Sequence, residues 1–240
     1  SSLQRHISIA VAYNTWIYYN ITGDTDFMAE YGAELFFDIC KFWASKATLN
    51  NNTNRYEIDE VMGPDEFHEK LPSASKGGVK NNAYTNIMVA WLFDRANELY
   101  GSLSKSQAEK ALSKVGISEG SIKEWSIIAQ KMTIPVNEDG IIEQFEGYFN
   151  LKELNIDEYR EKYGDIHRMD RVLKAEGKSP DDYKVAKQAD LLMTFFNVDP
   201  NVVKAITAES GYKLPKDFLS KNFDYYISRC SHGSTLSRVV

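Results

Sequence analysis

The chain is poor in cysteine: among its 240 residues only Cys40 and Cys230 occur, and they lie far apart. Cys40 falls within an apolar helical pattern, which predicts a core position, whereas Cys230 precedes a polar loop. The run Cys230-Ser231-His232 suggests metal binding, but no partner cysteine or histidine lies at ligand spacing. The sequence therefore predicts no metal site and a reduced, cytoplasmic protein.

Long apolar runs, a signal peptide and an excess of basic charge are missing as well. No run approaches the roughly 18 apolar residues that a membrane span needs. The net charge is −6 and the pI is about 5.4, whereas a nucleic-acid-binding protein needs a basic face for the phosphates. We expect neither nucleic acid nor a membrane among the partners.

What the chain does have is enough apolar bulk, 43% of its residues, to form one domain with a sizeable core. Apolar residues recur at helical spacing, most clearly at Phe27, Tyr31, Leu35, Ile39 and Trp43, which lie four residues apart. The class is all-α. The expected helices cover residues 3–20, 25–43, 82–99, 104–112 and 118–132, and further helices begin near 180, 201 and 215.

Three segments break this helical pattern. Residues 53–58 suit a short antiparallel excursion, and residues 140–145 are briefly β-like. Residues 152–178 are charged and only weakly periodic, which is typical of a mobile surface excursion.

Acidic residues crowd around a Gly-Pro turn between residues 56 and 69. Gly63 and Pro64 predict a shaped loop, because glycine permits unusual backbone conformations and proline fixes φ. One histidine, His68, lies in the same run. A rigid turn that carries acids and a histidine suits acid–base chemistry, but composition alone fits a solvated acidic loop as well. The carboxylates are those of Glu57, Asp59, Glu60, Asp65, Glu66 and Glu69.

This loop resembles the catalytic-loop signature of glycoside hydrolase family 65. The matching residues are Gly63-Pro64-Asp65-Glu66-Phe67-His68-Glu69 and Asn81-Asn82-Ala83-Tyr84-Thr85-Asn86. The family comprises inverting phosphorylases of maltose, trehalose, kojibiose and nigerose, with some hydrolases. The resemblance implies an (α/α)6 barrel of six helical hairpins. Residues 1–240 would form only part of that catalytic domain, without the family's N-terminal β-sandwich and C-terminal β domain. Relatives are often dimers, which leaves a homodimer of the full-length protein open.

Two later stretches match the same family. In Val185-Ala186-Lys187-Gln188-Ala189-Asp190-Leu191-Leu192-Met193, a helix start would put Lys187 and Asp190 on one face as a surface ion pair. The resemblance instead implies that Lys187 and Gln188 contact the glucosyl unit that is transferred.

The other stretch is Ser231-His232-Gly233-Ser234-Thr235-Leu236-Ser237. Hydroxyls and free N–H groups at a helix start suit an anion, although a helix cap without a ligand fits equally. The resemblance implies that His232, Ser234 and Thr235 bind inorganic phosphate, with Ser237 as a further candidate.

The predicted reaction is inverting phosphorolysis of an α-linked glucosyl disaccharide to β-glucose 1-phosphate. Inverting hydrolysis needs an acid and a base, whereas phosphate is already nucleophilic and needs an anion pocket in place of the base. Glu66 is the candidate general acid, and Asp65 and Glu69 are the next candidates. Inorganic phosphate is the co-substrate and no organic cofactor is implied. An inverting α-glucosidase or trehalase, and a catalytically silent carbohydrate-binding protein, are the alternatives.

Weaker likenesses to the family concern His6 and residues 142–149, and Lys80 is a departure from the family pattern. His6 fits a hydrogen-bonded core histidine better than a catalyst. Residues 142–149 fit a structural role. Lys80 stands before the asparagine pair, where many relatives have an acidic or neutral residue, and could alter the preference for the acceptor sugar.

Overall fold

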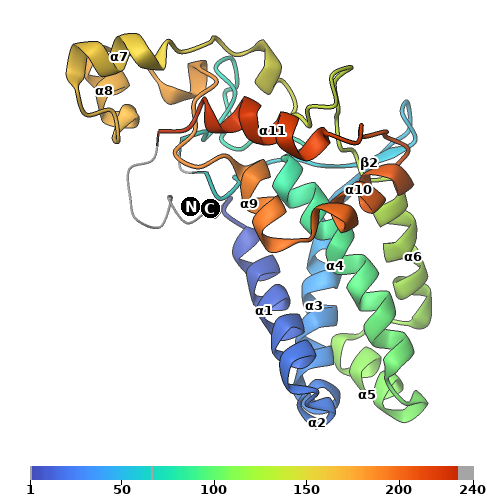
Figure 1. Ribbon diagram of the computed structural model, residues 1–240. Helices are drawn as coiled ribbons and strands as arrows, with labels where there is room; N and C mark the ends of the chain where they lie inside the picture. Colours follow the sequence, from blue (N-terminus) through green and yellow to red (C-terminus); the bar gives the residue numbers. More distant parts are fainter. Residues whose placement is uncertain (1, 66, 232–240) are drawn as a thin grey trace.

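The computed structural model describes residues 2–65 and 67–231, and most of this part of the chain is helical (Figure 1). One two-stranded antiparallel sheet is present in the described ranges, formed by β1 (Ala47–Asn50) and β2 (Arg55–Ile58). The helices are α1 (His6–Thr22), α2 (Thr25–Phe27), α3 (Ala33–Ala44), α4 (Ala83–Ser102), α5 (Lys105–Val115), α6 (Glu119–Gln130), α7 (Ile156–Tyr163), α8 (Met169–Ala175), α9 (Asp190–Asn197), α10 (Pro200–Glu209) and α11 (Phe218–Ile227). A π-helix, η1 (Met28–Gly32), and two 3-10 turns, η2 (Tyr148–Asn150) and η3 (Pro180–Asp182), complete the order.

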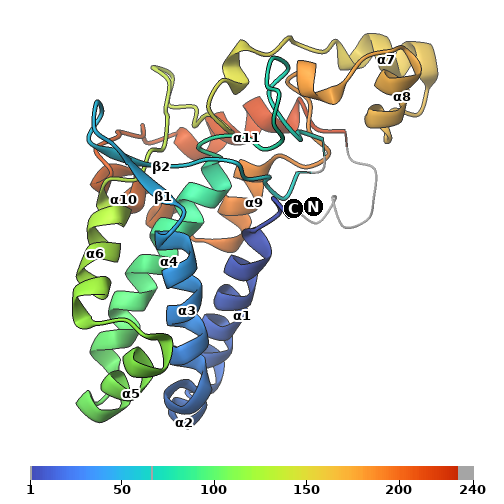
Figure 2. The same ribbon diagram turned by 180° about the vertical axis from the view of Figure 1, so that it is seen from behind.

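Helix α4 lies at the centre of the fold. It packs against α1, α3, α6, α9 and α10, and its first eleven residues are all buried. Figures 1 and 2 show α1, α3, α4 and α6 side by side with their axes roughly parallel. Aromatic rings fill the space between them, for example Phe93 of α4 stacked on Trp125 of α6 at 5.9 Å. The all-α interpretation is confirmed as a helix-rich architecture around this core.

The prediction of one continuous α-helix over residues 25–43 is wrong. The π-helix η1 interrupts it, and Tyr31 and Leu35 of the four-residue row are 65% and 42% exposed. A step of four residues overshoots a helical turn of 3.6 residues by about 40°, so a long row of this spacing drifts off one face. Phe36 and Phe37 contribute to the core in their place, beside Cys40, whose predicted burial is confirmed.

Other boundaries shift in smaller ways. The excursion predicted at 53–58 is confirmed as β2, which pairs with β1. The β-like run at 140–145 is only an isolated bridge between Val136 and Ile142. Pro180 starts a 3-10 turn and no α-helix, since α9 begins ten residues later at Asp190.

The charged segment 152–178 folds into α7 and α8 around a small hydrophobic cluster of its own. Tyr159, Met169 and Leu173 form this cluster together with Phe67 and Val185. Figures 1 and 2 show α7 and α8 beyond the end of the bundle where α4 begins, opposite α2 and α5. The segment is therefore packed onto the acidic loop through Phe67. Among the described residues, no helix is long and apolar enough to cross a membrane.

Candidate functional site

The site is built where the asparagine pair turns the chain into α4. Asn81 adopts a left-handed conformation with φ of 52°, and its buried side chain donates to Glu146 at 2.7 Å. Asn82 is the N-cap of α4: its Oδ1 accepts the N–H of Thr85 at 3.0 Å and the Thr85 hydroxyl at 2.9 Å. The Nδ2 of Asn82 remains available to donate on the opposite side.

Asp190, the first residue of α9, receives that donation. Its Oδ2 accepts from Nδ2 of Asn82 at 2.7 Å, and its Oδ1 accepts the backbone N–H of Asp65. Gly63 packs directly on this contact, because a Cβ atom there would overlap Oδ2 of Asp190 and lie 2.7 Å from Nδ2 of Asn82. Gly63 is therefore required for close approach and not for an unusual φ.

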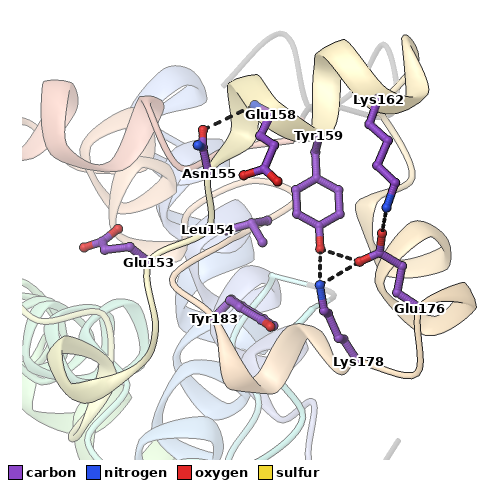
Figure 3. Close-up of a pocket in the computed structure, with 9 residues that line it drawn as sticks. All are labelled: Glu153, Leu154, Asn155, Glu158, Tyr159, Lys162, Glu176, Lys178 and Tyr183. Atoms are coloured by element: carbon purple, nitrogen blue, oxygen red, sulfur yellow. Dashed lines mark hydrogen bonds and ion pairs between the residues drawn. The ribbon is translucent and has the colours of Figure 1, made fainter.

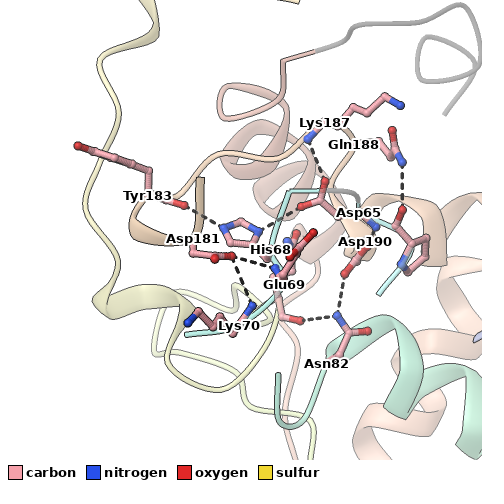
Figure 4. A network of polar contacts seen from close by, with 12 residues as sticks. Asp65, His68, Glu69, Lys70, Asn82, Asp181, Tyr183, Lys187, Gln188 and Asp190 are labelled. Atoms are coloured by element: carbon pink, nitrogen blue, oxygen red, sulfur yellow. Dashed lines mark hydrogen bonds and ion pairs between the residues drawn. The ribbon is translucent and has the colours of Figure 1, made fainter. Parts of the chain in front are cut away.

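The carboxylate of Asp65 is buried and fully used. Its Oδ1 accepts the backbone N–H of Lys187 at 2.9 Å, and its Oδ2 lies 3.1 Å from Nδ1 of His68. The other ring nitrogen of His68 lies 2.9 Å from the carbonyl oxygen of Tyr183. Figure 4 shows His68 between these two oxygen atoms. The imidazole thus connects Asp65 of the acidic loop to Tyr183 in the segment before α9.

Burial and neighbouring charges change the proton affinities of this network. Burial, and then the negative charge of Asp65, raise the pKa of Asp190 to about 7. Burial by itself would lower the pKa of His68, but the hydrogen bond and charge of Asp65 outweigh it and the net pKa is raised. The raised pKa of His68 favours its protonated form more than an ordinary imidazole's pKa would.

The segment 186–188 connects two loops that are distant in sequence. On one side, Gln188 Nε2 donates to the carbonyl of Pro64 at 3.2 Å (Figure 4). On the other side, the N–H of Ser231 donates to the carbonyl of Ala186 at 2.8 Å, and the N–H of Ala186 donates to the carbonyl of Arg229 at 3.0 Å. The chain just before residue 66 and the chain just before residue 232 therefore meet at one segment.

Five of the predicted site residues lie outside the described ranges: Glu66, His232, Ser234, Thr235 and Ser237. Of the others, Glu69 is exposed and its backbone N–H donates to Asp181 at 2.8 Å. Lys187 and Gln188 lie beside Asp65 and Pro64, half-buried. The surface ion pair on a helix face is wrong, because α9 begins only at Asp190 and Asp190 is turned inward.

Sequence reasoning missed the roles of Asn82, His68, Asp190 and Tyr183. The first three lie inside the matching motifs, but the contacts of Asn82 with Asp190 and of His68 with Tyr183 join residues that no local spacing relates. Tyr183 acts through its backbone carbonyl, which leaves no side-chain signal in a sequence.

The weaker candidates take structural positions. His6 is half-buried, with Nδ1 3.3 Å from the carbonyl of Met62, and burial lowers its pKa. Glu143 accepts the N–H groups of Gly147 and Phe149, each at 3.1 Å, which closes the loop at 143–149. Lys80 lies 3.0 Å from Glu57 and 3.4 Å from Glu146.

A separate cavity of about 280 Å³ lies on the 152–185 segment (Figure 3). Tyr159, Lys178 and Glu176 line it and bond to one another, with Lys178 Nζ 2.7 Å from both the tyrosine oxygen and the carboxylate. Tyr183 also lines it. Within the ranges that the structure describes, no cluster of three or more histidine, cysteine or carboxylate side chains could hold a metal ion.

The chain belongs to glycosyl hydrolase family 65: the sequence profile of that family's central catalytic domain matches residues 1–240. It is 42% identical over 240 residues to the trehalose 6-phosphate phosphorylase of Lactococcus lactis and 34% identical over 242 residues to the kojibiose phosphorylase of Halothermothrix orenii. These alignments cover 100% and 98% of this chain. The chain spans 30% and 27% of the length of those relatives.

A solved structure is similar as well. It is that of a protein from the human microbiome assigned as a kojibiose phosphorylase, with a TM-score of 0.74 and 26% sequence identity. The match covers 98% of this chain and 29% of that one. The fold around α4 is therefore shared with a member of the phosphorylase group.

Proposed function

We propose that the complete polypeptide catalyses inverting phosphorolysis of an α-linked glucosyl disaccharide. The observation that carries this proposal is the meeting of the three family motifs at residues 186–188. Pro64 and Asp65 bond to Gln188 and Lys187, and Ser231 bonds to Ala186. The named relatives, which act on trehalose 6-phosphate and kojibiose, support the same reaction class.

In this mechanism Glu66 is the general acid. It gives its proton to the glycosidic oxygen, the bond from that oxygen to C1 breaks, and a phosphate oxygen bonds to C1 from the opposite face. The carboxyl group is then reprotonated from solvent. The products are β-glucose 1-phosphate and the second sugar, and inorganic phosphate is the co-substrate.

The other residues bind and orient the substrates. Lys187 and Gln188 hold the glucosyl unit, and His232, Ser234 and Thr235 hold phosphate, with Ser237 as a further contact. Asp65 is a poor second candidate for the acid, because both of its oxygens are occupied inside the protein. Glu69, being exposed, remains the alternative acid.

Sugar release by the complete polypeptide tests the reaction. Trehalose, trehalose 6-phosphate, maltose, kojibiose and nigerose are each incubated with and without inorganic phosphate. We expect cleavage of one α-glucoside only with phosphate, with β-glucose 1-phosphate as product, and loss of turnover in Glu66→Gln but not in Glu60→Gln. Cleavage without phosphate would instead identify an inverting hydrolase, and sugar binding without any turnover a silent binding protein.

We also propose that the chain is one part of a larger (α/α)6 barrel. Helix α1 buries Ile9 and Trp16 against its neighbours, yet its opposite face exposes Ile7, Val11 and Ile21 by 60%, 41% and 78%. Such an apolar face suits cover by further helices. In the complete polypeptide, a cysteine at position 21 should react slowly with thiol reagents, whereas fast labelling would contradict this cover. The molar mass of the complete polypeptide, measured by light scattering, tests whether it forms the homodimer that the family resemblance leaves open.

A further inference from the structure

We propose that His68 is a positioning residue for the acid of this reaction. Its imidazolium joins the carboxylate of Asp65 to the carbonyl of Tyr183, and so fixes the backbone on both sides of residue 66. The inference rests on the proposed function, in which residue 66 supplies the proton.

The hydrogen-bond partners of the ring determine its protons. A backbone carbonyl can only accept, so Nε2 of His68 carries a hydrogen toward Tyr183, 2.9 Å away. Nδ1 faces Oδ2 of Asp65 at 3.1 Å, while Oδ1 of Asp65 already accepts from Lys187. An imidazolium that donates twice and a carboxylate that accepts twice satisfy every atom of this buried pair.

The surroundings favour this charge state and hold the ring in one orientation. The titratable groups that face His68 are Asp65 on its own loop, Asp181 in η3, Asp190 at the start of α9, and Tyr148 in η2. The carboxylates Asp65 and Asp181 stabilise a cation. The rings of Phe145 and Tyr148 contact the imidazole edge to face at 5.0 and 5.8 Å.

The consequence falls on the residue between these anchors. Asp65 is held on one side by His68, Lys187 and Asp190, and Phe67 on the other side is buried in the cluster of α7 and α8. Removal of His68 would release Asp65 from Tyr183. A small displacement of a catalytic group, of about 1 Å, costs on the order of 100-fold in rate.

Loss of the Nδ1 proton has the same effect as removal. Above the raised pKa of His68, the carboxylate of Asp65 would face a lone pair, so activity should fall as pH rises through that pKa. In Asp65→Asn, the amide would donate to a neutral imidazole and still accept from Lys187. In this variant the protonated imidazole is the mismatched form, so activity should show an added fall as the pH is lowered and His68 becomes protonated. The fall at high pH, where the general acid loses its proton, should remain in both proteins.

The experiment compares two substrates in the complete polypeptide. The disaccharide needs a proton on its leaving sugar, whereas α-glucosyl fluoride releases fluoride, a weak base, with little help from an acid. For His68→Gln we expect kcat on the disaccharide to fall about 100-fold with KM changed less than about threefold, and kcat on the fluoride to fall less than about fivefold. The control is His167→Gln, an exposed histidine that pairs with Asp165, which should leave both rates unchanged.

Equal losses on the two substrates, or wild-type rates in His68→Gln, would overturn the proposal. If His68→Gln does not fold, Asp65→Asn decides, since a pH profile of this variant without an added fall at low pH is incompatible with the proposal. Nitrogen-15 NMR of histidine-labelled protein tests the His68 proposal separately from the proposed function. A doubly protonated signal near pH 7 that is missing in His68→Gln supports the ion pair with Asp65. A neutral imidazole overturns the ion pair even if phosphorolysis is observed. Phosphate-independent cleavage would overturn the proposed function but leave the His68 comparison valid, because hydrolysis needs the same acid.

Discussion

Gly63 and Asp190 are in contact although they are far apart in the sequence, and a Cβ atom on Gly63 would overlap Oδ2 of Asp190. This contact lies between the acidic loop and the start of α9. It also includes Asn82, which donates to the same oxygen of Asp190. A glycine, an amide and a carboxylate from three segments thus define the position of the acidic loop relative to α4.

Gly63→Ala should displace this loop. We expect a loss of about 1–3 kcal/mol in the free energy of unfolding, because the new methyl group has no space, together with a large loss of kcat. Thermal unfolding and kinetics of the complete polypeptide provide the measurement. Gly101→Ala in α4 is the matched control, since nothing lies within 4 Å of a Cβ there, and alanine should stabilise that helix by up to about 1 kcal/mol. Equal effects of the two variants would contradict the role of the contact.

Asn82 acts as a hydrogen-bond acceptor on one side and as a donor on the other. Its oxygen caps α4 and its Nδ2 donates to Asp190. Asn82→Ser should keep the cap and cost about 1 kcal/mol, whereas Asn82→Asp should cost more, about 3 kcal/mol, because two carboxylates would meet in a buried site.

The difference between the two Asn82 variants should shrink at about pH 5, where Asp190 is protonated. Unfolding midpoints at both pH values test this. Ser104→Ala, which removes the cap of α5, gives the cost of an ordinary cap. An Asn82→Asp protein as stable as Asn82→Ser at neutral pH would show that the bond to Asp190 is unimportant.

The raised pKa of Asp190 predicts a pH dependence of stability. Its pKa is about 7 in the folded protein and about 3.9 in an unfolded chain. Between these values the folded state binds the extra proton, so the contribution of Asp190 is fully present below about pH 4 and is lost as pH rises through 7.

Asp190→Asn lacks this proton. The stability difference between wild type and Asp190→Asn should therefore decrease from about pH 5 to about pH 8. Comparing the two proteins by thermal unfolding removes the contribution of His68, which has the same sign. A difference that is constant or increases with pH would contradict the raised pKa.

Lys80 should affect stability slightly and the acceptor sugar not at all. Its side chain is 31% exposed and its ammonium group lies between Glu57 and Glu146. Lys80→Met should therefore cost at most about 1 kcal/mol after solvent screening. Acceptor KM values in the synthetic direction provide the test, with Lys76→Met, a more exposed lysine paired with Glu60, as control. A change in acceptor preference in Lys80→Met alone would restore the role that its sequence position suggested.

Local patterns predicted the elements that depend on local causes. The helix expected over 82–99 follows from its apolar content and is confirmed as α4, which begins at Ala83. The π-helix at Met28–Gly32 could not be predicted in this way, because the four-residue row of Phe27 and Tyr31 fits an uninterrupted helix equally well. The packing of the charged segment 152–178 could not be predicted for a similar reason, because its few apolar residues share a cluster with Phe67 and Val185, which lie outside the segment.

The sequence by itself determined the helical class, the core position of Cys40, and the motifs that place the chain in its family. Only the tertiary structure decided how those motifs serve one another: that Asp190 faces inward, that His68 lies between Asp65 and Tyr183, and that Gly63 must lack a side chain. The physical reason is that a buried charge or a close approach is defined by its partner across the fold. Spacing along the chain carries no information about a partner more than a hundred residues away.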